Sequence, residues 1–365
     1  MNAEALVSLS ALKENYRLLE ARVKGERTNG KLWCVVKSDA YGHGLLPCAK
    51  ALYTAGARHF CVAKAEEGLT LKAYLPKAEV LVLGKTDAKN RDTLAAFGIL
   101  QAVHSFAYAK TLSGGDTTPL AIHIKIDIGM GRMGVSAAVL ADAVQEILAI
   151  SRLPNIQIKG VFAHLPEADM LNSAKTPTQI EKFHRIVGAL RSEGLVFDTH
   201  LCATAGLLRF GLAGCEGARA GIGLYGISPS PAIGCPSLRP ALSLSCPLLQ
   251  VKMLGAGESV GYGGAWRTPA PGSIGVIPFG YADGLPRLCE GGKVFVFGRK
   301  VPLAGRISMD YATLWLGSLP AEEGDTVTVY DKKGKNLLAL AKQAQTIPYE
   351  LLSTLSPRVK RTYMT

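Results

Sequence analysis

The sequence predicts an α/β protein with an N-terminal (β/α)8 TIM barrel over residues 1–230 and a C-terminal, mostly-β domain over residues 231–365. Three observations lead to this prediction. The chain has 365 residues, which is well above an average domain of about 150 residues. Up to about residue 227, apolar runs typical of buried parallel strands alternate with segments of helical periodicity. Beyond Pro229 the apolar runs become short and alternating, with glycine and proline between them.

The first half of the chain carries the barrel pattern. A helix is expected first, over residues 6–23, because Leu12, Tyr16, Leu19 and Val23 recur at helical spacing. Eight candidate strands follow, at 31–37, 59–63, 79–84, 99–105, 121–127, 156–164, 197–203 and 218–226. Helical spacing marks five segments between them, at 45–55, 64–74, 87–97, 137–150 and 178–192. Eight apolar strands alternating with helices favour a closed parallel barrel.

The second half of the chain is predicted to form a separate β domain. Residues 226–240 are rich in proline, glycine and serine, so we expect a linker there. Apolar, alternating runs follow at 241–254, 272–280, 293–298, 301–309, 311–317 and 325–331. Helices are expected to be few in this part of the chain.

Composition narrows the classes of function. The net charge is +12, but the charges are scattered and no basic stripe carries interleaved aromatic residues, so no nucleic-acid partner is predicted. The 8 cysteines form no CxxC pair, which argues against a zinc ribbon or a thioredoxin-type site. No apolar run approaches the roughly 18 residues of a membrane span and no signal segment is evident, so we expect a cytoplasmic protein without membrane contact.

Lys37 is the first candidate for chemistry, because it follows an apolar run that should form a buried strand. A buried ammonium is costly unless it is paired, neutralised or used, although a lysine at a strand end usually reaches solvent. In a barrel, reactive groups gather at the carboxyl ends of the strands. Further polar or phosphate-binding candidates fall at such ends: Lys125, Arg132, His164, His200, Thr204, Arg219, Gly221 and Ile222.

These residue types match the needs of one cofactor. A lysine can form an imine, an arginine can face a ring nitrogen, and a hydroxyl with glycine-rich backbone can hold a phosphate. Such a set is typical of a pyridoxal phosphate enzyme. The segment "VVKSDAYGHG" resembles the cofactor-lysine motif of the alanine racemase family. The resemblance extends in family order through "KIDIGMGRMGV", "FAHLPEAD", "ARAGIGLYG", "GYADG" and "GRISMD", and so covers nearly the whole chain.

The resemblance implies an isomerase that interconverts L- and D-alanine and supplies D-alanine for peptidoglycan. Lys37 would hold pyridoxal 5'-phosphate covalently and act as one acid/base, which requires a pKa well below its ordinary value of about 10.4. Tyr262 matches the second base, supplied in the family by the β domain of a second subunit. The resemblance therefore implies a homodimer with shared active sites.

The remaining roles are also implied only by the resemblance. Arg219 would face the pyridine nitrogen and His200 would hydrogen-bond it, while His164 would lie over the ring. Arg132 would approach the cofactor and the substrate carboxylate, oriented by Lys125, which can be carbamylated in the family. The phosphate would be bound by Tyr41, Thr204, Gly221 and Ile222, and the substrate side would be lined by Tyr281, Met309 and Asp310.

The chain departs from the family pattern at three places. Ala203 and Thr204 stand where Asn-Ser is common, so a hydroxyl is kept but an amide is lost. Pro357 replaces a tyrosine that steers the second base, and Ile128 replaces a threonine. These changes leave open a broader alanine/serine racemase, because one hydroxyl is weakly discriminated in an apolar pocket.

Two hypotheses from other classes are less favoured. A decarboxylase with a barrel and a β domain prefers an acidic residue at the pyridine nitrogen, which Arg219 does not provide. A non-catalytic pyridoxal phosphate carrier with a single barrel needs neither the β domain nor Tyr262.

Overall fold

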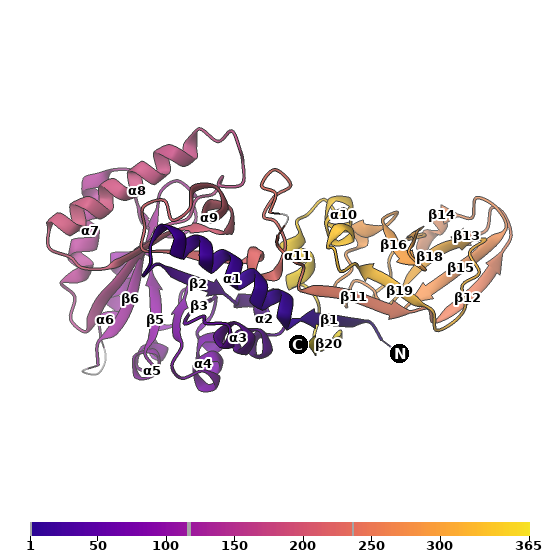
Figure 1. Cartoon of the computed structure of the whole chain (residues 1–365), viewed down its shortest axis with the longest axis horizontal. Helices are drawn as coiled ribbons and strands as arrows, with labels where there is room; N and C mark the ends of the chain where they lie inside the picture. The colour runs from indigo at the N-terminus through magenta and orange to yellow at the C-terminus, as the bar shows by residue number, and fades with distance from the viewer. Residues whose placement is uncertain (1, 115–117, 236) are drawn as a thin grey trace. The chain divides into compact units, whose positions relative to one another are not determined.

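The computed structural model describes residues 2–114, 118–235 and 237–365. The chain folds into two compact units (Figure 1). The barrel unit contains Lys13–Ser38 and Leu45–Leu238. The β unit contains the residues up to Leu12, together with Asp39–Gly44 and Arg239–Thr365. Two short early segments therefore pack with the second half of the chain.

The barrel unit confirms the predicted closed parallel barrel. Its eight strands pair in the order β2-β3-β4-β5-β6-β8-β9-β10, and β10 pairs back onto β2. The strands are β2 (Lys31–Val35), β3 (His59–Val62), β4 (Glu79–Val82), β5 (Ile99–Val103), β6 (Leu120–Asp127), β8 (Ile156–Phe162), β9 (Asp198–Ala203) and β10 (Gly217–Ala220). A two-residue strand, β7 (Val135–Ser136), extends the sheet beside β6.

Helices surround these strands (Figure 1). They are α1 (Leu9–Glu26), α2 (Lys37–Tyr41), α3 (Leu45–Thr54), α4 (Ala65–Tyr74), η1 (Ala88–Asn90), α5 (Arg91–Ala96), α6 (Phe106–Ser113), α7 (Leu140–Ser151), α8 (Lys175–Ser192), α9 (Thr204–Phe210) and η2 (Ile222–Tyr225). The sequence pattern missed α6 and α9, which are short and carry only brief apolar stripes. Within the described part of 226–240, which leaves out Pro236, the predicted linker has neither helix nor strand.

The β unit is built on one six-stranded sheet and one three-stranded sheet. The larger sheet has the order β17-β16-β19-β11-β1-β20 and the smaller the order β12-β15-β18, while β13 and β14 form a separate hairpin. The bounds are β1 (Glu4–Ser8), β11 (Leu242–Pro247), β12 (Gln250–Leu254), β13 (Ser259–Val260), β14 (Trp266–Arg267), β15 (Gly272–Ile277), β16 (Lys293–Val296), β17 (Arg299–Pro302), β18 (Ala312–Gly317), β19 (Thr326–Tyr330) and β20 (Lys360–Met364). Its helices are η3 (Tyr262–Gly264), η4 (Arg287–Cys289), α10 (Lys335–Gln343) and α11 (Pro348–Ser353).

Three predictions of secondary structure were wrong. The strand predicted over residues 218–226 ends at Ala220, and Ile222–Tyr225 form η2. The opening helix begins at Leu9 rather than residue 6, because residues 4–8 form β1, which pairs with β11 and with β20. Those partners lie more than 200 residues away in sequence, so helical spacing alone could not reveal the strand. The run 301–309 is a strand only as far as Pro302, after which it forms an irregular loop with an isolated bridge at Leu303.

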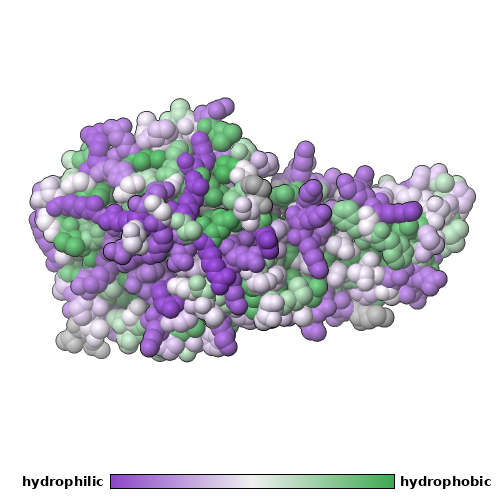
Figure 2. All heavy atoms as spheres, viewed as in Figure 1, coloured by the Kyte–Doolittle hydropathy of each residue, from purple (hydrophilic) through white to green (hydrophobic). Residues whose placement is uncertain are grey.

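No helix among the described residues is long and apolar enough to cross a membrane. On the face drawn in Figure 2, hydrophilic side chains are interspersed with apolar ones.

Candidate active site

Lys37 lies just beyond the end of β2, at the start of α2. The strand ends at Val35, two residues earlier than predicted. Both neighbours of Lys37 are tied to adjacent elements: the Val36 N–H donates to the Cys61 carbonyl (2.9 Å), and the Ser38 N–H donates to Oε1 of Glu67 (2.7 Å). The backbone around Lys37 is therefore held by β3 and by the first turn of α4.

The four residues after Lys37 have left-handed backbone. Their φ angles are +53° to +54° from Ser38 to Tyr41. For residues with a Cβ this region costs about 1–2 kcal/mol per residue relative to a right-handed helix. Such strain persists only where surrounding structure enforces it, and it gathers at functional sites.

The amine of Lys37 is half-buried among positive charges. Burial lowers its pKa, and the charge of Arg132 lowers it further. Lys125 has the same environment, because burial and the charges of Arg132 and Arg219 lower its pKa to about 8. Burial and the same two arginines lower the pKa of His164 to about 3. The structure thus brings these five predicted residues together at one end of the barrel, where burial and neighbouring positive charge disfavour the charged forms of both amines and of the imidazole.

Arg132 stands on a loop that is shaped by one carboxylate. Asp127, the last residue of β6, accepts hydrogen bonds from four successive backbone N–H groups, those of residues 129–132, at 2.8–3.2 Å. Burial opposes ionisation of this carboxyl group, but the backbone donors hold its pKa below its ordinary value. Asp127 therefore fixes the base of the loop, while Arg132 itself is exposed.

Arg219, on β10, is buried and extensively hydrogen-bonded. Its Nη1 donates to Nδ1 of His200 (2.7 Å) and to the carbonyl of His200 (2.8 Å). Its Nη2 donates to the carbonyls of Ala163 (2.7 Å) and Leu201 (3.1 Å). In the part of the chain that the structure describes, the Nε–H has no protein acceptor within hydrogen-bond distance. A ligand atom with a lone pair would satisfy it.

The sequence interpretation missed a third member of this group, His123 on β6. Its Nδ1 lies 2.8 Å from Nε2 of His200, so a chain of polar groups runs from Arg219 through His200 into the barrel interior. A histidine within an apolar strand gives no local signal of a role. Its pairing with Gly160 in the register of β6 and β8 can be seen only in the folded structure.

These buried histidines make stability pH-dependent. Burial, aided by the charges of Lys31 and Arg219, lowers the pKa of His123 to about 3, against 6.5 when unfolded. Between these values the unfolded chain binds more protons, so the free energy of unfolding falls as the pH drops below 6.5. His123 alone is expected to contribute a loss of about 2 kcal/mol between pH 7 and pH 5. Urea unfolding at pH 7, 6 and 5 measures this loss. It should be smaller in His123→Phe, and equal losses in both proteins would refute the prediction.

The candidate phosphate site lies at the start of α9 and the end of β10. The Thr204 hydroxyl is buried and accepts hydrogen bonds from the N–H groups of Gly221 (3.1 Å) and Gly223 (3.3 Å). A Cβ on Gly223 would lie 2.6 Å from the Thr204 methyl group, so only glycine permits this approach. Ile222 lies between the two glycines, and Thr204 begins α9 instead of ending the strand.

In the β unit, Tyr262 stands at the tip of the β13–β14 hairpin and is 67% exposed. The hairpin is anchored below it, because Val260 belongs to a buried cluster and the Trp266 ring lies 5.5 Å from that of Trp315. The left-handed φ angles of Gly261 (+76°) and Gly263 (+71°) bend the chain around the tyrosine. Tyr262 is thus an exposed aromatic residue at the tip of a hairpin whose strands are well packed.

Tyr281, Met309 and Asp310 lie on two loops joined by backbone hydrogen bonds. The N–H of Tyr281 donates to the carbonyl of Ser308 (3.1 Å), and that of Ala282 donates to the carbonyl of Met309 (2.9 Å). Tyr281 and Met309 are exposed at 43% and 53%. Tyr41 also belongs to the β unit, where its ring lies 6.2 Å from that of Tyr349. Five predicted residues, with Tyr262 among them, therefore belong to the β unit rather than to the barrel unit.

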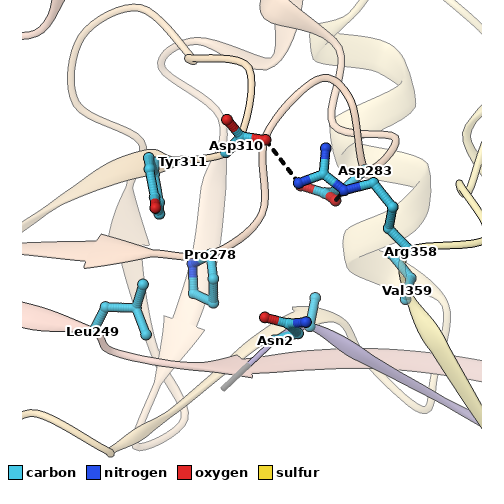
Figure 3. Close-up of a pocket in the computed structure, with 9 residues that line it drawn as sticks. Asn2, Leu249, Pro278, Asp283, Asp310, Tyr311, Arg358 and Val359 are labelled. Carbon is cyan, nitrogen blue, oxygen red and sulfur yellow. Dashed lines mark hydrogen bonds and ion pairs between the residues drawn. The ribbon is translucent and has the colours of Figure 1, made fainter.

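Arg358 is a further residue that the sequence interpretation missed. It forms ion pairs with Asp310 (2.7 Å) and with Asp283 (3.3 Å), beside a pocket of about 280 Å³ (Figure 3). Asp283 in turn accepts a hydrogen bond from the Gly280 N–H (3.0 Å). Arg358 thus links both loops to the segment that contains Pro357, one of the positions where the sequence departs from the expected pattern.

Comparisons with known proteins identify the family. The model of the alanine racemase N-terminal domain matches residues 7–229, and that of the alanine racemase C-terminal domain matches residues 241–363. The chain belongs to the alanine racemase family. Among relatives, an alanine racemase of Syntrophobacter fumaroxidans is 35% identical over 96% of this chain and 94% of its own length. One of Aeromonas hydrophila is 34% identical over 99% of each chain.

Solved structures of the family share the fold. The alanine racemase from D-cycloserine producing Streptomyces lavendulae is 31% identical and superposes with a TM-score of 0.91 over 100% of this chain and 97% of its own. That of Bartonella henselae, described with covalently bound pyridoxal phosphate, is 29% identical with a TM-score of 0.89 over 100% of each chain. The family and the fold class predicted from the sequence are thereby confirmed. The comparisons give no support to a serine-accepting racemase, a decarboxylase or a carrier.

Proposed function

We propose that this protein is a pyridoxal phosphate-dependent racemase that interconverts L- and D-alanine in the cytoplasm and supplies D-alanine for peptidoglycan. The observation that carries the proposal is the pairing of a half-buried lysine of lowered pKa with a buried arginine held by His200. The names of the relatives support alanine as the substrate. The test is turnover: with added pyridoxal phosphate, either pure enantiomer of alanine should become an equal mixture, followed by circular dichroism. A preparation that leaves both enantiomers unchanged would contradict it.

The residues present fit this cofactor. The Nε–H of Arg219, which lacks a protein acceptor among the described residues, suits an unprotonated pyridine nitrogen. The O–H of Thr204, whose oxygen already accepts from the Gly221 N–H, and the close backbone around Gly221 and Ile222 suit a phosphate. The amine of Lys37 suits the aldehyde, because imine formation requires a neutral amine and its pKa is lowered.

The two proposed bases transfer protons on opposite faces of the α-carbon. The chemistry supplied by bound pyridoxal phosphate is electron withdrawal from the α-carbon, which acidifies the α-proton. The Lys37 amine would exchange a proton with the α-carbon on one face. Tyr262 exchanges a proton on the opposite face, so removal by one base and return by the other invert the configuration. Lys37 and Tyr262 reverse these roles for the other enantiomer.

The other proposed site residues bind and orient the cofactor and the substrate. Arg219 carries a permanent charge toward the ring nitrogen and so disfavours its protonation, which limits side reactions. Arg132, with Lys125 beside it, offers a cationic partner for the substrate carboxylate. We place His164 over the ring, close to Arg219, whose Nη2 is 3.4 Å from its Nδ1. On the substrate side we place Tyr281, Met309 and Asp310, and at the phosphate Tyr41.

We further propose a homodimer in which Tyr262 serves the partner's site, since it is exposed at a hairpin tip. The two variants Lys37→Ala and Tyr262→Phe are each expected to be nearly inactive. Co-expressed in equal amounts, they should regain about a quarter of wild-type activity, because half of the random dimers are mixed and each mixed dimer has one intact site of two. Co-purification through two different affinity tags isolates the mixed dimer. If it has no activity above the single variants, the two bases act within one chain.

Thr204 provides a prediction for cofactor binding. Thr204→Val removes the hydroxyl but keeps the branched shape, so the dissociation constant of pyridoxal phosphate is expected to rise roughly tenfold, as for one lost hydrogen bond to a charged group. Thr204→Ser is the matched control and should stay within about twofold of wild type. Fluorescence titration of the cofactor-free protein gives both values. Equal affinity in Thr204→Val would exclude the hydroxyl from the phosphate site.

A further inference from the structure

The His123 side chain is buried in the barrel, where the absence of a side chain at Gly160 makes room for its ring. It is 2% exposed, flanked along β6 by the buried Ile122 and Ile124, and it shares its face of the strand with Lys125 two residues further on. Its partner in register on β8 is Gly160, where an added Cβ would lie 2.5 Å from atoms of the His123 ring. The ring is packed edge-on against Trp33, with 5.4 Å between the ring centres. The position is therefore built for a flat ring, with one polar neighbour.

The direction of each hydrogen bond follows from the donors available. A guanidinium only donates, so Nδ1 of His200 must accept from Arg219. A neutral imidazole carries one hydrogen, which on His200 must then lie on Nε2. This N–H donates to Nδ1 of His123 at 2.8 Å. Burial keeps both rings neutral, because it is the largest cause of the lowered pKa of each histidine.

We propose that His123 is a positioning residue, which together with Arg219 holds His200 in the Nε2–H tautomer and thereby keeps Arg219 oriented in the cofactor site. In the other tautomer, the Nδ1–H of His200 would face an N–H of Arg219, and two donors would oppose each other. The Arg219 donor disfavours that tautomer from one side, and the acceptor at His123 stabilises the Nε2–H from the other. This inference rests on the proposed function only in the use of the Arg219 Nε–H toward the cofactor.

Packing alone is a rival explanation, since Phe162 stacks on His200 with ring centres 4.8 Å apart and also lies under Arg219. Two substitutions separate packing from hydrogen bonding. His123→Phe keeps an aromatic ring but removes the acceptor. His123→Asn loses ring volume but places an amide oxygen near the former position of Nδ1. His59→Phe is the control, because the His59 ring lies 5.1 Å from the same Trp33 ring and has no hydrogen bond to His200.

The test is ¹⁵N NMR of the full-length holoenzyme labelled in histidine, with kinetics on the same samples. In the wild type and in His59→Phe, His200 should show the Nε2–H tautomer. In His123→Phe, where only Arg219 still favours that tautomer, the Nδ1–H form of His200 should become detectable, and kcat should fall fivefold to tenfold, as for one lost hydrogen bond, while KM for alanine changes less than about twofold. His123→Asn should restore the tautomer and most of kcat.

Two results would overturn the proposal: an unchanged His200 tautomer in His123→Phe, or equal impairment of His123→Asn and His123→Phe. A wild-type enzyme without turnover would instead count against the proposed function. The tautomer of His200 would still decide the role of His123.

Discussion

Replacing Lys37 by alanine is expected to abolish the visible absorption band of the bound cofactor and to lower turnover of either enantiomer by at least about 10³-fold. The variant loses both the covalent attachment and one of the two bases. Lys125, with a pKa of about 8, is the other amine of this cluster, but it is not expected to replace Lys37 fully. The measurements are the absorption spectrum of the purified protein and the rate of racemisation.

Lys125→Met is the comparison for this experiment. It removes a second half-buried amine from the same cluster, but it should keep the absorption band, because the imine is assigned to Lys37. If the absorption band is retained in Lys37→Ala and lost in Lys125→Met, the cofactor is attached to Lys125 and the assignment to Lys37 is wrong.

Replacing Tyr262 by phenylalanine is expected to lower racemisation by roughly 10²–10⁴-fold, the usual effect of losing a general acid/base. The aromatic ring remains, so the exposed hairpin should fold unchanged. Lys37 can still remove the α-proton of one enantiomer and return it to the same face. In deuterated water, one enantiomer should therefore exchange its α-hydrogen without inversion, as measured by NMR of recovered alanine.

Tyr281→Phe provides the matched substitution, since Tyr281 is another exposed tyrosine of the β unit. It should lower racemisation by less than about tenfold, because binding contacts outside proton transfer contribute less than a lost base. Racemisation by Tyr262→Phe at close to the wild-type rate would require a different second base.

Local sequence patterns were sufficient to predict most of the barrel strands. The eight strands are short apolar runs bounded by turn residues, and Lys37, Arg219 and Thr204 were predicted as site residues because the strand ends of a barrel gather at one face. The errors of two residues at Val35 and Phe162 are ordinary for element ends, whereas the strand predicted to run to residue 226 ends at Ala220. They do not change which side chains meet, because His164 and Lys37 follow their strands directly.

What the sequence could not reveal depends on long-range contacts. β1 needs β11 and β20 as partners, and Glu67 holds Ser38 across 29 residues. His123 acquires a role only when β6 and β9 lie in one barrel. None of these long-range contacts produces a periodic pattern of apolar residues in the sequence. The left-handed turn after Lys37 is similarly hidden, because Ser38–Tyr41 contains no glycine to mark it.

The most direct test of the central claim, that Lys37 is the covalent anchor of the cofactor, is borohydride reduction of the holoenzyme, followed by proteolysis and mass spectrometry. The reduced pyridoxyl group is expected on the peptide that contains Lys37. Modification of Lys125 or of any other lysine in its place, or no modification at all, would contradict the claim.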